Sequence, residues 1–121
     1  MKAINKNRDL IKYLSGEFSL LSSKLYKIDI YNDAKSDLII DLYLELLYAK
    51  GDNRIKLAFT GIEEFSFYHH HSSYFYNVER YKLLEINDRF YLCLDPSEEV
   101  ENISTEDQNF ILSRDVYGFF I

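Results

Sequence analysis

The sequence contains no tryptophan, one cysteine, one proline and four glycines among its 121 residues. Since Cys93 is the only cysteine, no disulfide can form within the chain, which is typical of a protein from a reducing compartment. The few glycines form no loop that could cradle a phosphate, and no GxSxG motif marks a nucleophilic serine. We therefore expect no catalytic residues and no cofactor.

Long hydrophobic runs are also missing. The first ten residues, MKAINKNRDL, lack the apolar segment of a signal peptide. The longest near-apolar run is interrupted by Asp41 and Glu45, so it is too short and too charged to span a membrane. These observations predict a cytoplasmic protein without membrane segments.

Basic residues are outnumbered, with 14 Lys and Arg against 20 Asp and Glu, which gives a formal net charge of −6. Sequence-independent binding of nucleic acid depends on Lys and Arg that neutralise phosphates, so this balance argues against a nucleic-acid partner. It is compatible with a basic protein partner, although many soluble proteins carry a similar charge.

Tyrosine and phenylalanine are abundant, with 11 and 9 copies, and both favour the half-buried surface of a β-sheet. The clearest strand pattern begins at residue 37. Every second position is apolar, at Leu38, Ile40, Leu42, Leu44, Leu46 and Tyr48. Because strand side chains alternate between faces, these residues share one apolar face. A turn at residues 50–53 and a second alternating run follow, so residues 37–59 predict a long β-hairpin.

A second hairpin is predicted in residues 80–95. Asn87 and Asp88 suit a two-residue turn, because both residue types tolerate the left-handed backbone conformation. This turn pairs residue 86 with 89, residue 85 with 90 and residue 83 with 92. The resulting register gathers large apolar side chains on one face, apart from Glu85, at Tyr81, Leu83, Phe90, Leu92 and Leu94. The other face carries Lys82, Leu84, Ile86, Arg89, Tyr91 and Cys93.

Shorter patterns complete the predicted fold. Residues 7–14 indicate a short helix, residues 24–31 a strand, and residues 109–121 a further strand. Gly61 interrupts a strand pattern and predicts a bulge or bend before residues 62–68 continue it. We expect a single, mainly β domain over residues 1–121. Its antiparallel sheet would curve into a sandwich or a partly closed barrel, with the helix packed on one end.

Two loops are candidates for protein contact. The first, which we call the aromatic loop, is residues 68–76, and it includes Tyr68, Tyr74 and Tyr76. Tyrosine is enriched in binding surfaces, while packing over the sheet end would also account for these rings. The second, residues 97–107, is the most acidic segment, and its acids are Glu98, Glu99, Glu101, Glu106 and Asp107. It lacks the DxDxDG pattern of a calcium loop, so it predicts a solvated loop or a surface for a basic protein.

The His69-His70-His71 tract is a weaker candidate for metal binding. On a strand, His69 and His71 would point to one side, but a catalytic zinc site usually has three protein ligands, and no HExxH motif is present. Glu63 and Glu64 are near in sequence at a spacing that matches no motif. We expect no metal centre. The alternative is a small-ligand or metal-binding protein, or an enzyme, with its site near these histidines.

Asp41 and Glu45 share a strand face and are the only obvious carboxylate pair for acid–base chemistry. We expect them instead to solvate the outer face of the sheet, with Asp29 doing the same on the neighbouring strand.

Four stretches together resemble small bacterial proteins of uncharacterised families: LIIDLYLEL, NRIKLAFTGIEEF, RFYLCLDP and ISTEDQNFILSRDVYGFF. Some of these families are similar to immunity proteins of polymorphic toxin systems. The resemblance implies a non-enzymatic, mainly β cytoplasmic protein that neutralises a toxin by binding it. A homo-oligomer joined through exposed sheet edges is compatible with this function.

Overall fold

The computed structural model describes residues 1–72, 75–98 and 100–121, and it consists of one antiparallel sheet with one short α-helix. In chain order the elements are β1 (Lys2–Lys6), α1 (Asn7–Tyr13), the 3-10 helix η1 (Gly16–Phe18), β2 (Ser23–Asn32), β3 (Leu38–Glu45), β4 (Arg54–Ser66), β5 (Asn77–Val78), β6 (Lys82–Ile86), β7 (Arg89–Asp95) and β8 (Gln108–Phe120).

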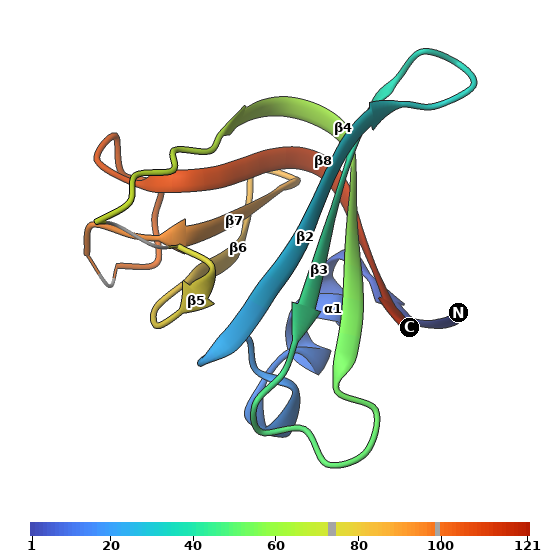
Figure 1. Cartoon of the computed structure of the whole chain (residues 1–121). Coiled ribbons are helices and arrows are strands. Elements are labelled where there is room, and N and C mark those ends of the chain that lie inside the picture. Colours follow the sequence, from blue (N-terminus) through green and yellow to red (C-terminus); the bar gives the residue numbers. More distant parts are fainter. Residues whose placement is uncertain (73–74, 99) are drawn as a thin grey trace.

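The strands are arranged in the order β5-β2-β3-β4-β8-β7-β6, and β1 pairs with the last part of β8. Figure 1 shows this sheet curled into a half-barrel, with α1 packed at one end. The predicted fold class is therefore confirmed, and of the two predicted forms the sheet adopts the partly closed barrel.

The apolar face predicted for the first hairpin is confirmed. Ile40, Leu42, Leu44 and Leu46 are all buried in the core between the walls of the half-barrel. The hairpin turn is longer than predicted, because the strands separate after Leu46 donates its backbone N–H to the Asn53 carbonyl, at 2.7 Å. Tyr48 consequently lies exposed in the loop and does not extend the apolar face.

The second hairpin has the predicted register. Ile86 pairs with Arg89, Glu85 with Phe90 and Leu83 with Leu92. Asn87 and Asp88 both have positive φ, at 51° and 61°, which is the conformation that a tight hairpin turn of this twist requires. Local turn chemistry was therefore sufficient to set this pairing.

β4 and β8 are the longest strands, with 13 residues each, and they pair along nearly their whole length. Gly61 has a positive φ of 63°, and the register shifts between Ile62 and Glu64, which confirms the predicted irregularity. The first half of β8 also pairs with β7 and its second half with β1. The bent pair therefore joins the two walls of the half-barrel.

Asp41 is buried, with 3% of its surface exposed, so the expectation that it solvates the outer face is wrong. The Tyr31 hydroxyl donates a hydrogen bond to Asp41 Oδ2 at 2.8 Å, while Asp41 Oδ1 is buried without a hydrogen-bond partner among the described residues. The same hydrogen bond, together with burial, raises the pKa of Tyr31 to about 12. Glu45 stays half-buried and lies 3.4 Å from the Arg54 guanidinium.

Helix α1 lies over β8 where Gly118 leaves room for it. Leu10, on the buried side of α1, is fully enclosed, and a Cβ atom on Gly118 would clash with Leu10 Cδ1. The absence of a side chain at this position therefore sets how closely the helix approaches the sheet.

We predict that Gly118→Ala lowers the free energy of unfolding by about 1–3 kcal/mol, because the added methyl group overpacks this contact. In a Leu10→Ala background the same change should have a much smaller effect, since the methyl group would enter space that Leu10 has vacated. Chemical denaturation of the four proteins of this double-mutant cycle measures the difference. Strictly additive effects would show that the two residues do not compete for space.

Candidate functional site

The two predicted contact loops emerge from the same end of the sheet. β4 leads into the first loop and β8 follows the second, and Ser66 pairs with Phe110 where these strands meet. The backbone N–H of Tyr68 donates to Asn109 Oδ1 at 2.6 Å, which ties the start of one loop to the end of the other. Figure 1 shows both loops at the left end of the half-barrel.

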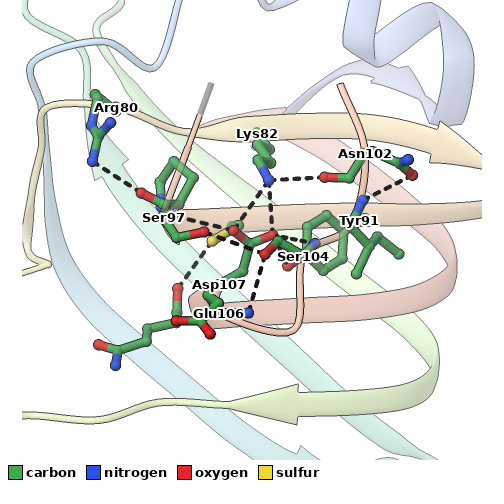
Figure 2. Close-up of polar contacts among 12 residues, drawn as sticks. Arg80, Lys82, Tyr91, Ser97, Asn102, Ser104, Glu106 and Asp107 are labelled. Carbon is green, nitrogen blue, oxygen red and sulfur yellow. Dashed lines mark hydrogen bonds and ion pairs between the residues drawn. The ribbon is translucent and has the colours of Figure 1, made fainter. Parts of the chain in front are cut away.

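The acidic segment is fixed to the sheet by Asp107, whose side chain is completely buried (Figure 2). Lys82 Nζ donates to both of its carboxylate oxygens, at 3.1 and 3.0 Å. The Tyr91 hydroxyl donates to Oδ2 at 2.8 Å. The backbone N–H groups of Ser97 and Ser104 also donate to this carboxylate, at 3.2 and 3.1 Å. Asp107 therefore anchors the loop from inside. The prediction from the sequence, that Asp107 faces a partner, is wrong for this residue.

Further hydrogen bonds hold the loop at points along its length. Lys82 Nζ donates to the Asn102 carbonyl at 2.8 Å. Arg80 Nη2 donates to the Pro96 carbonyl at 3.0 Å, and the Cys93 thiol donates to the Gln108 carbonyl at 3.0 Å. Arg80, Lys82 and Cys93 therefore bond to the segment at three points, which are Pro96, Asn102 and Gln108.

The pKa values in this network follow from burial and hydrogen bonding. Burial alone raises the pKa of Asp107, but the hydrogen bonds it accepts outweigh this effect and hold its pKa below the ordinary value. Burial and the hydrogen bond to Asp107 raise the pKa of Tyr91. Burial also raises the pKa of Cys93, to about 11, so its thiol stays protonated and unreactive at neutral pH.

The anchored loop presents acidic and apolar side chains to solvent. We call residues 97–106 the acidic loop. Glu98, Glu101 and Glu106 are exposed, as predicted from their polarity, while Glu99 lies outside the described residues. Val100 and Ile103 are also exposed, at 44% and 42%, although their side chains are apolar. The loop therefore combines negative charge with uncovered apolar surface.

Each of these two apolar residues borders a surface pocket. Val100 lines a pocket of about 370 Å³ together with Leu21, Tyr81 and Leu83. Ile103 lines a second pocket, of about 350 Å³, with Phe110 and Leu112. The acidic loop therefore borders two depressions whose lining is mainly apolar and also includes acids such as Glu101 and Glu64, and each depression is large enough for partner side chains.

The aromatic loop contributes less to this surface than its composition suggests. Tyr68 is 56% exposed, close to the end of the acidic loop. Tyr76 is half-buried, with its ring centroid 4.3 Å from that of Phe75 and 5.6 Å from that of His69. Tyr74 lies outside the described residues. Among the placed tyrosines of this segment, Tyr68 is the one available for contact.

Among the described residues, the histidine tract is not joined by further metal ligands. The rings of His70 and His71 are tilted by 31° with their centroids 4.4 Å apart, and His70 Nδ1 lies 2.6 Å from the Ser72 hydroxyl. Glu63 is paired with Arg89 and Arg114, so it does not turn toward the histidines. Over residues 1–72, 75–98 and 100–121, no three His, Cys, Asp or Glu side chains are grouped to hold a metal ion.

Comparison with known proteins adds no assignment: no protein-family model matches the chain, and no curated protein or solved structure is significantly similar to it. In the described part of the chain, no helix has the length and apolar character needed to cross a membrane.

Sequence reasoning missed the role of Lys82 in this site. The predicted register of the second hairpin already placed Lys82, Tyr91 and Cys93 on one face of the hairpin. If this face is buried, the lysine needs a counter-charge there, because an unpaired buried charge is strongly unfavourable. The identity of that partner, 25 residues further along the chain, came only from the structure.

We predict that Asp107→Asn lowers the free energy of unfolding by about 3–5 kcal/mol at neutral pH, because it leaves the buried Lys82 ammonium without its counter-charge. The native pKa of Asp107 is depressed, so its contribution is present above the unfolded-state pKa and is lost as pH falls through the native pKa. The difference between wild type and variant should therefore shrink in acid, below about pH 4.

Urea denaturation at neutral and at acidic pH measures both effects. Glu106→Gln is the matched control, because this neighbouring acid is exposed, and it should change stability by less than about 0.5 kcal/mol. If Asp107→Asn were as stable as wild type at neutral pH, the buried carboxylate would not anchor the loop.

Proposed function

We propose that this chain is a non-enzymatic protein-binding module that holds a basic protein against its acidic loop. The observation that carries the proposal is the combination of a loop anchored through the buried Asp107 carboxylate and three exposed glutamates on that loop.

Anchoring favours binding because a loop that is already ordered loses little conformational entropy when a partner docks. The hydrogen bonds from Lys82, Tyr91 and the loop backbone supply this order before any partner arrives. The pockets beside the acidic loop combine apolar side chains, such as Val100 and Ile103, with acids, such as Glu101 and Glu64. This lining suits a partner that carries both basic and apolar side chains.

The charged and the apolar side chains of the acidic loop would have different roles in recognition. Glu98, Glu101 and Glu106, on a protein of net charge −6, would steer a basic partner toward the loop and disfavour acidic proteins. Val100 and Ile103 would then become buried at the centre of the contact, where apolar residues contribute most to interface stability. Tyr68 would lie at the edge of the same surface.

The partner class that we propose is a toxin domain, neutralised in the cytoplasm. The support is the resemblance of four stretches of the sequence to uncharacterised bacterial families, some of which are similar to immunity proteins, together with the acidity of the loop. A protein of this kind acts by covering a basic functional surface of the toxin, and it needs no catalytic residue of its own.

The test compares two variants of equal net charge. The loop variant carries Glu98→Gln, Glu101→Gln and Glu106→Gln, and the control carries Asp9→Asn, Asp37→Asn and Asp52→Asn, which are exposed acids outside the loop. Each protein, immobilised without a histidine tag, captures proteins from a lysate of the source organism. The captured protein is then purified and its affinity measured by titration calorimetry.

We expect wild type and control to bind one basic protein with similar affinity and the loop variant to bind it at least tenfold more weakly. Equal binding by the loop variant, or capture of no basic protein, would overturn the proposed function. Co-expression tests the toxin assignment separately: wild type should restore growth to cells that express the captured protein, and the loop variant should not. A captured protein that does not impair growth would overturn the toxin assignment alone.

A further inference from the structure

Strand β2 leaves an open edge on the half-barrel. β5 covers it only at Ser23 and Lys24, and the Tyr76 carbonyl accepts the N–H of Leu25. In the part of the chain that the structure describes, no strand pairs with residues 26–32 on this side. Unpaired strand edges are templates for association with another strand.

The hydrogen-bond pattern shows which residues face this edge. Asp33 donates its N–H to the Asp37 carbonyl, and antiparallel pairs alternate along the strands, so Tyr31, Asp29 and Lys27 bond to β3. Ile28 and Ile30 therefore direct their backbone N–H and C=O groups away from β3, toward the open edge. These groups are positioned to continue the sheet.

Exposed apolar side chains accompany the unpaired backbone. Tyr26, Ile30 and Tyr31 are exposed at 40%, 46% and 44%. A long edge strand with such side chains would normally be covered or interrupted, because it invites association. The apolar character of the strand thus points to a partner that covers it.

The charges on the strand select the partner. Lys27 and Asp29 flank Ile28 on the outer face, and their charged groups lie 3.5 Å apart. When two copies of β2 pair antiparallel about a two-fold axis at Ile28, Lys27 of each copy stands opposite Asp29 of the other. These are non-hydrogen-bonded positions, where opposite residues approach most closely, with Cα atoms about 4.5 Å apart. Opposite charges in such positions stabilise the pair, and a strand with another charge order would be disfavoured.

We propose that the chain forms a homodimer in which β2 pairs with β2 of a second copy about an axis at Ile28, so that one sheet continues through both copies. The interface is isologous, with each Lys27–Asp29 contact made twice. No residue of the acidic loop belongs to this edge, so the dimer and the proposed toxin contact stand or fall independently.

Charge reversal on the edge tests the arrangement. Lys27→Asp places two acids on the edge and Asp29→Lys places two lysines there. Each variant alone should weaken the dimer at least tenfold, because like charges then stand opposite each other. The swap Lys27→Asp with Asp29→Lys restores complementarity and should restore the dimer. Lys35→Asp, in the exposed turn after β2, is the matched control and should leave the dimer unchanged.

Sedimentation equilibrium over a concentration series measures these affinities, and circular dichroism verifies that each variant is folded. A mixture of the Lys27→Asp and Asp29→Lys proteins is a further test, because neither protein is expected to dimerise by itself. The two should form a heterodimer, because each acidic edge then faces a basic one. A monomeric wild type, or a dimer that both reversals leave intact, would overturn the proposal.

Discussion

The pairing of β4 with β8 is the interaction on which the rest of the structure depends. These two strands connect the wall formed by β2 and β3 with the wall formed by β6 and β7. Their bend near Gly61 curls the sheet, and Gly118 gives α1 a place to close the core. The same pairing makes the end of β4 and the start of β8 neighbours. Two loops that are about 30 residues apart in the sequence therefore share one end of the molecule.

At that end, the buried ion pair of Lys82 and Asp107 fixes a loop to the sheet, a role that a disulfide or a metal ion has in other small proteins. Taking Lys82 and Asp107 out of water is unfavourable, and their attraction offsets it only when the remaining hydrogen-bonding capacity is also satisfied. Tyr91, the loop backbone and the Asn102 carbonyl meet that condition. The ion pair is therefore best understood as a device that specifies one loop conformation, which is the property that a preformed binding surface needs.

The half-barrel also leaves an edge that a closed barrel would not have. On β2, Asp29 has a charged neighbour as well as solvent, since it stands directly opposite the buried Asp41 on β3. Like charges in this position are unfavourable. The Lys27 ammonium beside Asp29 and the Tyr31 hydroxyl bonded to Asp41 reduce this repulsion. The same Lys27–Asp29 order gives the edge its self-complementary charge pattern, so one local arrangement serves both the sheet and the proposed dimer.

The sequence by itself determined the longer strands, the two main hairpins, the helix and the buried face of β3, because side-chain alternation and turn residues act over a few neighbouring positions. It did not predict β1 or β5, whose pairing partners β8 and β2 are distant in the sequence. It determined the register of β6 with β7 because Asn87 and Asp88 adopt the conformation that a two-residue turn requires. It did not distinguish Asp107 from the exposed acids around it, because a local sequence pattern does not show which acid pairs with a lysine 25 residues away. It did not show that Asp41 is buried either. Only the tertiary structure decided these points, because the burial of a charged group depends on partners that the curled sheet brings together.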